Sequence, residues 1–126
     1  MKKIVLTEKA PAPIGAYSQG VAIDNMIFTS GQLPVDMQSG AIIYGDIAKA
    51  ARAALDNVIA VVEAAGGDKG SIVKTTVFLK DMSDFPEVNK VYADCFPQDP
   101  PARSAVQVAK LPKDVDIEIE AIALKI

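Results

Sequence analysis

The last quarter of the chain, residues 100–126, holds the side chains best suited to chemistry. Arg103, Glu118 and Glu120 stand there among apolar residues, in two segments with the composition of β-strands. The planar fork of an arginine can hold a carboxylate by two parallel hydrogen bonds, and a glutamate can polarise a water molecule. The sequence contains no histidine, the usual proton shuttle near neutral pH. We therefore expect any catalysis to use carboxylates, arginine, hydroxyls, backbone amides and water.

A hairpin would bring these charged side chains together. Two β-type runs, 103–110 and 115–124, flank the segment 111–114, whose proline and aspartate favour a turn. If the loop closes between the ends of these runs, four polar side chains share one face of the predicted hairpin: Arg103, Gln107, Glu118 and Glu120. In this register Arg103 and Glu118 are offset by four positions, about 13 Å along a strand, and Glu120 is closer.

Four sequence segments share the order and spacing of one known family. They are A-P-I-G-A-Y-S-Q-G at 12–20, T-S-G-Q-L-P at 29–34, I-V-K-T-T-V-F-L-K-D-M-S-D-F-P-E-V-N-K-V-Y at 72–92, and P-A-R-S-x-V-x-x-A-x-L-x5-I-E-I from 101 to 119. In these segments the chain resembles the YjgF/RidA family of small enamine and imine deaminases. The segments extend over nearly the whole chain, so the resemblance is specific.

The resemblance implies a function and a set of site residues. It implies hydrolysis of 2-imino acids, such as 2-iminopropanoate and 2-iminobutanoate, to 2-keto acids and ammonia, with no metal or organic cofactor. It selects Arg103 for the substrate carboxylate and Glu118, the glutamate of I-E-I, for the attacking water, and leaves Glu120 as the alternative. It adds substrate-binding positions in the same cleft: Tyr17, Ser30, Gly31 and Ala105.

The same residues also have ordinary structural interpretations. Arg103 could form a structural ion pair with a glutamate, and Tyr17 beside a proline-rich loop could simply pack. The single cysteine, Cys95, lies in an apolar helical stripe and is expected in the core. Many family members have a cysteine at position 105, where this chain has alanine, so only the backbone of Ala105 could serve a ligand. Gln107 replaces a glutamate that relatives often have.

Composition limits the classes of protein to which the chain could belong. Its 126 residues fit one domain, 1–126, and half of them are hydrophobic, enough for one core. The net charge of −3 gives no positive field for nucleic acid. No apolar run approaches the roughly 18 residues of a membrane span, and no signal segment precedes the first strand. We expect a cytoplasmic protein that binds small 2-imino or 2-keto acids, without nucleic acid or membrane partners.

The patterning along the chain predicts about six strands and two helices. The expected strands are 3–7, 21–23, 26–29, 72–80, 103–110 and 115–124. A helix should begin after Asp46 and stop at Gly66-Gly67. A second helix, capped by Ser83 or Asp84, should end at Pro97.

Two helices can cover only one face of a six-stranded sheet, yet the strands 72–80 and 115–124 carry apolar side chains on both faces. The second face needs a partner, so we expect a closed oligomer that packs sheet against sheet. The resemblance likewise implies an α+β, chorismate-mutase-like subunit with a mixed sheet, assembled as a homotrimer with sites between subunits.

Two further functions remain open from the sequence. A non-enzymatic trimer could use Arg103 to bind small carboxylates or purine-like ligands and regulate a partner protein. Some relatives are described as ribonucleases that inhibit translation, but the acidic charge balance and the missing histidine make this the weakest of the three functions here.

Overall fold

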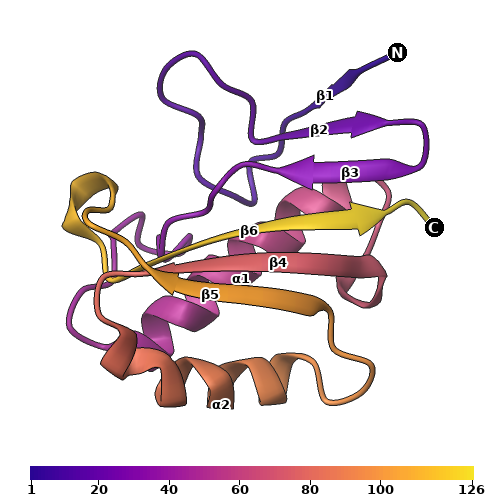
Figure 1. Cartoon of the computed structure of the whole chain (residues 1–126). Helices are drawn as coiled ribbons and strands as arrows, with labels where there is room; N and C mark the ends of the chain where they lie inside the picture. Colours follow the sequence, from indigo (N-terminus) through magenta and orange to yellow (C-terminus); the bar gives the residue numbers. More distant parts are fainter.

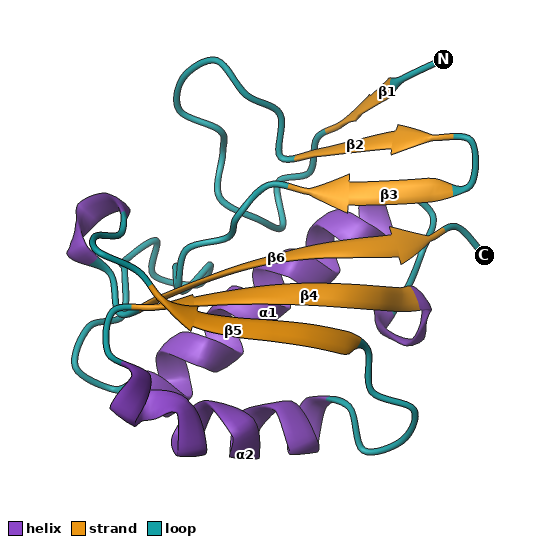
Figure 2. Cartoon of the chain, viewed as in Figure 1, coloured by secondary structure: helices purple, strands orange, loops and turns teal.

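The computed structural model describes all residues from Met1 to Ile126. The strands are β1 (Lys3–Val5), β2 (Gly20–Ile23), β3 (Met26–Thr29), β4 (Ile72–Leu79), β5 (Ala102–Gln107) and β6 (Ile117–Leu124). The helices are α1 (Ile47–Ala64) and α2 (Phe85–Cys95), with short 3-10 turns η1 (Lys69–Ser71), η2 (Met82–Asp84) and η3 (Pro112–Asp114). The predicted count of six strands and two helices is confirmed (Figure 2).

The six strands form one mixed sheet in the order β1-β2-β3-β6-β4-β5 (Figure 1). Strands β4 and β5 run parallel, and all other neighbours are antiparallel. The parallel pair is connected through α2, because parallel neighbours need a long crossover, usually helical. The predicted strands 21–23 and 26–29 are joined by a tight turn at Asp24-Asn25, with Asp24 at φ 51 and Ile23 paired with Met26.

The predicted hairpin between the last two strands is wrong. Strand β4 lies between β5 and β6 and pairs with both, so β5 and β6 do not touch as neighbours. The connecting segment does turn, as its residues indicated, through η3 with Lys113 and Asp114 at positive φ. It sends the chain past β4 rather than back along β5, and β4 occupies the interior of the sheet between the two strands.

Helix α1 begins and ends as its sequence predicts. The carboxylate of Asp46 accepts a hydrogen bond from the Lys49 amide (3.2 Å), which caps the first turn. Gly66 adopts the left-handed conformation (φ 97) just past the helix end. One face of α1 is buried on the sheet through alanine, leucine and valine side chains, and this face anchors the core.

Helix α2 is capped differently from the prediction. Asp84 occupies the N-cap position, but its side chain makes no capping hydrogen bond. Instead, the carboxylate of Asp81 accepts from the Ser83 amide (2.9 Å) and caps the preceding turn η2. The predicted apolar stripe is confirmed, with Val88, Tyr92 and Cys95 buried.

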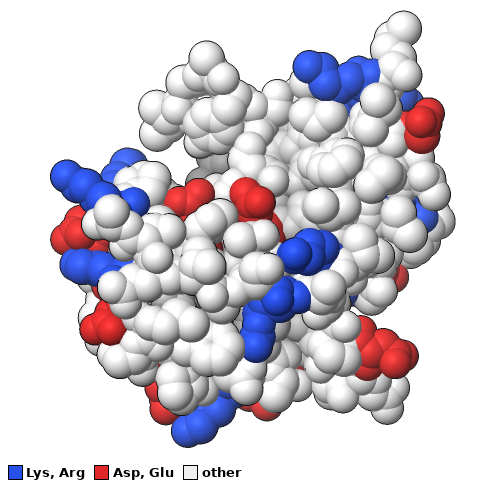
Figure 3. All heavy atoms as spheres, in the orientation of Figure 1, with Lys and Arg blue, Asp and Glu red and all other residues white.

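Both helices lie on one face of the sheet, as predicted, and the core forms between them and that face (Figure 1). Alternate residues of β6 are fully buried there, including Ile117, Ile119 and Ala123. The opposite face stays uncovered and carries exposed apolar side chains: Ile4, Ile23, Met26, Phe28 and Val106. Figure 3 shows a surface that is mostly uncharged, with only a few charged groups in its middle. No helix is long and apolar enough to cross a membrane.

Candidate functional site

A cavity of about 800 Å³ opens between the N-terminal loop, the segment after β3, and η3. Its lining includes four of the residues that the sequence predicted for the site: Tyr17, Ser30, Gly31 and Glu118. Only two charged residues line it, Glu118 and Lys113. The remaining walls are largely apolar, so the cavity is suited to a small organic molecule with few polar groups.

The wall that carries Tyr17 is held in place by Gln19, whose side chain is almost completely buried. Its amide oxygen accepts from the Thr7 amide (2.7 Å), and its NH2 group donates to the carbonyl oxygens of Thr7 and Pro11 (3.0 and 2.8 Å). These bonds tie the proline-rich loop to the start of β2. Tyr17 itself is half exposed, at 52%, and its hydroxyl accepts a long hydrogen bond from the Ile14 amide (3.4 Å). The loop is therefore ordered, with the Tyr17 ring at the cavity mouth.

The floor of the cavity is fixed to β6 by Gln32. The backbone of Gln32 exchanges two hydrogen bonds with Ile119, at 2.7 and 3.1 Å. The hydroxyl of Ser30 is already used, since it donates to the Ser18 carbonyl (2.5 Å). The bridge to Ile119 places Gly31 directly beside Glu118, so the two predicted site residues meet across the β3–β6 boundary.

Gly31 is the residue that makes room for the Glu118 carboxylate. A Cβ built on Gly31 would overlap Oε2 of Glu118 and lie 2.7 Å from its Cδ and 3.0 Å from its Cγ. Any larger residue at position 31 would therefore push the carboxylate away. The family resemblance implies a substrate-binding position at Gly31; the structure gives this glycine a steric role beside Glu118.

Glu118 is a half-buried carboxylate with no donor in its own chain. It forms no ion pair and accepts no side-chain hydrogen bond, and neither does Glu120. Burial of Glu118 raises the pKa of its carboxyl group, and the negative charge of Glu120 raises that pKa further. A group in this state can accept a proton near neutral pH more readily than a solvated glutamate.

Arg103 lies elsewhere, on the opposite face of the sheet. Arg103 pairs with Thr75 of β4, whereas Glu118 pairs with Phe78, three residues further along. Residues an odd number of positions apart point to opposite faces, and three positions span about 10 Å. The single chain therefore does not bring Arg103 and Glu118 together, contrary to the face that the predicted hairpin assigned to them. Gln107, which the predicted hairpin placed on the same face as Arg103 and Glu118, contacts η2 instead: its side-chain oxygen accepts a hydrogen bond from the Met82 amide (2.8 Å).

The Arg103 side chain packs on aromatic rings of α2. Its Cζ atom lies 4.8 Å from the centre of the Phe85 ring and 4.9 Å from the centre of the Tyr92 ring. The predicted alternative, an ion pair between Arg103 and a glutamate, is not formed. Ala105 lies on the same strand, facing the core, and lines neither this cluster nor the cavity. Strand β5 is the last strand of the sheet, so Arg103 lies at a free edge.

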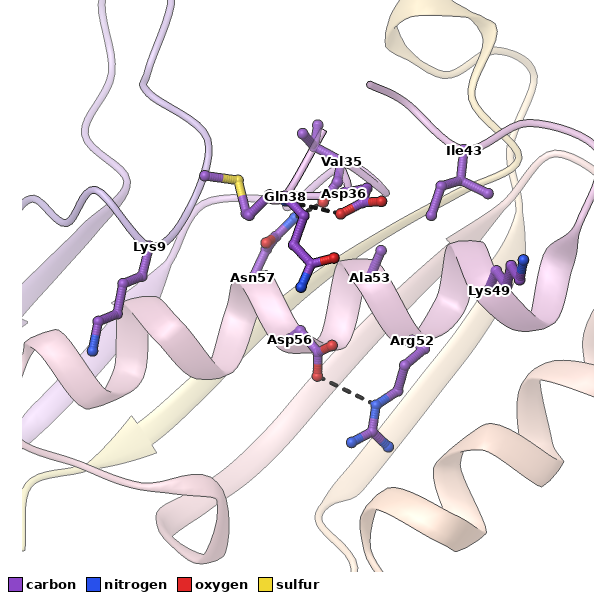
Figure 4. Close-up of a pocket in the computed structure, with 11 residues that line it drawn as sticks. Lys9, Val35, Asp36, Gln38, Ile43, Lys49, Arg52, Ala53, Asp56 and Asn57 are labelled. Atoms are coloured by element: carbon purple, nitrogen blue, oxygen red, sulfur yellow. Dashed lines mark hydrogen bonds and ion pairs between the residues drawn. The ribbon is translucent and has the colours of Figure 1, made fainter. Parts of the chain in front are cut away.

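A second, smaller cavity of about 370 Å³ lies between α1 and the segment after β3 (Figure 4). Lys9, Lys49 and Arg52 supply its cations, and Asp36 and Asp56 its carboxylates. Arg52 and Asp56 pair with each other at 3.3 Å, and both side chains are about half exposed. Because these charges are solvated and nearly balanced, the cavity has no strong preference for a ligand.

Among the polar and charged side chains that line the larger cavity, sequence reasoning did not select three as site residues: Gln19, Gln32 and Lys113. Gln19 and Gln32 stand within the motifs Y-S-Q-G and S-G-Q-L-P, so their positions were a usable signal. Lys113 had no signal, because its place at the cavity depends on the path of η3. No group of three or more potential metal-ligating side chains occurs in the chain.

The comparisons with known proteins identify the class of protein that combines this fold and this cavity. A family model described as "Endoribonuclease L-PSP" matches residues 7–125. The 2-iminobutanoate/2-iminopropanoate deaminase of Escherichia coli is 56% identical over 128 aligned residues, which cover 99% of each chain. The chain belongs to the YjgF/RidA family, whose fold is chorismate-mutase-like.

Solved structures agree with this family assignment. The crystal structure of the YjgF gene product from E. coli has 56% sequence identity and a TM-score of 0.93, covering 98% of this chain and 99% of that one. A structure of E. coli TdcF with bound serine has 50% identity and a TM-score of 0.91, with 98% and 99% coverage. Both similarities cover 98% of the chain, so the fold is shared over nearly its whole length.

Proposed function

We propose that this protein is an enzyme that hydrolyses 2-imino acids, including 2-iminopropanoate and 2-iminobutanoate, to 2-keto acids and ammonia. The observation that carries the proposal is the Glu118 carboxylate, which is half-buried in a small-molecule cavity and forms no ion pair or side-chain hydrogen bond within the chain. A cationic iminium group would complement this carboxylate. The deaminase name of the E. coli relative at 56% identity supports the same chemistry.

The proposed reaction requires the protein to position the substrate and a water molecule and to supply one proton acceptor. A water molecule attacks C2 of the protonated imine while Glu118 accepts the proton that the water loses. Glu118 then returns this proton to the nitrogen, and the C–N bond breaks to release ammonia. The hydroxyl oxygen becomes the keto oxygen, and its proton passes to water. The carboxylate also stabilises the iminium charge before attack. In this scheme no metal or organic cofactor takes part.

Arg103 is proposed to hold the carboxylate of the substrate. Since Arg103 and Glu118 lie on opposite faces of one chain, they can act on one substrate only if they come from different chains. The uncovered apolar face of the sheet supports a closed oligomer, and we propose the homotrimer that the sequence predicted, with Arg103 of one subunit reaching the cavity of the next. The backbone of Ala105, on the same edge strand, would lie beside the ligand.

The proposed activity is tested with imine generated in place. A pyridoxal-phosphate dehydratase acting on serine or threonine supplies the imine, and the rate of keto acid and ammonia formation is measured with and without this protein. An increase above the spontaneous hydrolysis rate is expected. No increase at micromolar enzyme would refute the activity. Sedimentation equilibrium should give three times the 13.3 kDa chain mass, and a stable monomer would refute the shared site.

Mixing of two inactive variants tests whether the site is shared between subunits. Arg103→Ala and Glu118→Gln trimers are unfolded together and refolded at equal concentration. If each site takes Arg103 from one subunit and Glu118 from its neighbour, about a quarter of the sites in random trimers are intact. Recovery of about a quarter of the wild-type activity is expected. No recovery in mixed trimers of verified composition would place both residues in one subunit's site.

The runner-up function is a non-enzymatic trimer that binds small carboxylates. The TdcF structure with bound serine favours ligand binding in a close relative. The dehydratase assay separates the two functions, because a binding protein would retain the ligand without increasing the rate of ammonia release.

A further inference from the structure

The guanidinium group of Arg103 lies against two aromatic rings and has no ion-pair or side-chain hydrogen-bond partner in the chain. Two aromatic rings of α2, Phe85 and Tyr92, lie within 5 Å of Cζ, at 4.8 and 4.9 Å. None of the ion pairs or side-chain hydrogen bonds in the chain involves Arg103. The five N–H donors of this half-buried arginine therefore have no side-chain partner in the chain.

Aromatic contact and hydrogen bonding use different parts of a guanidinium. The negative face of a ring attracts the cation through its flat surface. The five N–H donors point outward in the plane of the group, so ring contact leaves them free. A carboxylate binds at this edge through two parallel hydrogen bonds. The rings can therefore fix the cation without competing for the donors that a ligand needs.

We infer that Phe85 and Tyr92 are positioning residues, which hold the Arg103 guanidinium at the free edge of β5 with its N–H edge open to the carboxylate of a 2-imino or 2-keto acid. This inference rests on the proposed function, since it assigns Arg103 a carboxylate ligand. In this arrangement α2 orients the arginine through its rings. In an ion pair, an acidic side chain would have had this role.

The Tyr92 ring is itself rigidly supported. Tyr92 is 5% exposed, and its hydroxyl donates to Oγ1 of the fully buried Thr75 (3.0 Å). Thr75 is the β4 residue that pairs with Arg103, so the hydroxyl bond and the arginine share one row of the sheet. The Phe96 ring packs on Tyr92 with centroids 5.6 Å apart. Burial raises the pKa of Tyr92 to about 12, so the hydroxyl stays protonated at neutral pH.

A purely structural role for the rings makes a different prediction. If the rings only stabilise the fold, their replacement lowers the melting temperature and leaves ligand affinity unchanged in the protein that remains folded. If they position Arg103, affinity for a carboxylate falls even where the fold is intact. Affinity for pyruvate, the keto acid product of 2-iminopropanoate hydrolysis, is the readout that separates the two roles.

The experiment compares three Phe85 variants of the full-length protein, because Phe85 is only half-buried and tolerates change better than Tyr92. Phe85→Leu removes the ring, Phe85→Tyr keeps it, and Phe85→pentafluorophenylalanine keeps its shape but reverses the charge distribution of its face. Pyruvate affinity is measured by NMR titration, with the Arg103 Nε–Hε signal as a direct probe of the guanidinium. Melting temperature and oligomer mass are recorded for each variant.

Pyruvate affinity should fall roughly three- to thirtyfold in Phe85→Leu, the range of one cation–π contact. The pentafluorophenylalanine variant should also bind pyruvate more weakly than the wild type, whereas Phe85→Tyr should keep the wild-type affinity. The Arg103 Nε–Hε signal should move in Phe85→Leu, which removes one of the two rings beside the guanidinium, and should stay near its wild-type position in Phe85→Tyr. Unchanged affinity in the folded fluorinated variant would overturn the inference, whether or not Phe85→Leu folds.

Arg103→Lys separates this inference from the proposed function. If Arg103→Lys keeps wild-type pyruvate affinity, Arg103 is not the carboxylate ligand, and both the positioning role of the rings and the role proposed for Arg103 fail, whereas the ammonia-release assay alone decides the proposed activity. If Arg103→Lys weakens binding strongly while the Phe85 variants do not, only the positioning role is wrong.

Discussion

Replacement of Gly31 by alanine should reduce activity strongly while leaving the fold intact. The new Cβ would overlap the Glu118 carboxylate oxygen and lie 2.7 Å from Cδ, well below the 3.4 Å at which ordinary contact begins. The carboxyl group must therefore withdraw by about 1 Å. A catalytic group misplaced by about 1 Å can lose about 10² in rate, which corresponds to about 2.7 kcal/mol of transition-state stabilisation.

The cost to folding should be small for three reasons. Glu118 gives up no hydrogen bond when it moves, because it has no donor in the chain. Its displacement into another rotamer costs about 0.5–1.5 kcal/mol at most. Gly31 is not among the residues with positive φ, so alanine fits the backbone and stabilises by about 0.4–1 kcal/mol through the unfolded state. These two effects nearly cancel, and the melting temperature should change by only a few degrees.

The assay is the dehydratase-coupled rate of ammonia release at equal trimer concentration. Gly70→Ala is the matched control, since its added Cβ would lie 3.4 Å from the nearest atom and its backbone is not strained. Gly31→Ala should also have almost no further effect in a Glu118→Gln background, because it acts through that carboxylate. Full activity of Gly31→Ala, or a further large loss in the Glu118→Gln background, would refute this reasoning.

Three further predictions concern the arginine, the glutamate and the buried tyrosine. Arg103→Lys should nearly abolish imine hydrolysis, because lysine keeps the charge but loses the two-pronged geometry; Glu118→Gln should cost about 10²–10⁴-fold, and Glu120→Gln less. Near-full activity of Arg103→Lys, or a silent Glu118→Gln beside a damaging Glu120→Gln, would contradict these roles. A 13C NMR titration should give Glu118 a pKa above that of a solvated glutamate, lowered by Glu120→Gln. Since the folded state then holds this proton more tightly, the Glu118 contribution to stability is greatest below the unfolded-state pKa and is lost as pH rises through the folded-state pKa; an unshifted Glu118 would exclude the burial effect. Tyr92→Phe should destabilise by about 1–3 kcal/mol by leaving the Thr75 hydroxyl buried without a partner, and adding Thr75→Val should recover part of this loss in urea unfolding. Strictly additive losses would show that the hydroxyls do not interact.

The local elements could be predicted because their signals are local. Asp46 and Gly66 mark the ends of α1 through capping and left-handed geometry, and Asp24-Asn25 marks the β2–β3 turn. Each of these features depends on a few consecutive residues. The cavity residues Tyr17, Ser30, Gly31 and Glu118 came from the family resemblance, since no short-range rule places residues 17 and 118 side by side.

The error in the last two strands has a physical cause. A turn-forming segment between two β-type runs indicates a hairpin, but it does not exclude another strand from the space between them. Strand β4 takes that space and pairs with both strands, and the α2 crossover makes β5 its parallel neighbour. The contact between Arg103 and the rings of Phe85 and Tyr92 follows from this crossover. The sequence pattern could not predict this contact, because it did not place β4 between β5 and β6.

Insertion of β4 also changes what a functional site requires. In the predicted hairpin, Arg103 and Glu118 shared a face, and a ligand could have spanned the distance between them. In the observed sheet their β4 partners, Thr75 and Phe78, point to opposite sides, and a packed sheet separates the two groups. No rotamer of either side chain removes this separation. If both groups act on one substrate, the edge position of β5 is what makes it possible, because Arg103 points to the helix-covered face and can meet a neighbouring chain at the sheet edge.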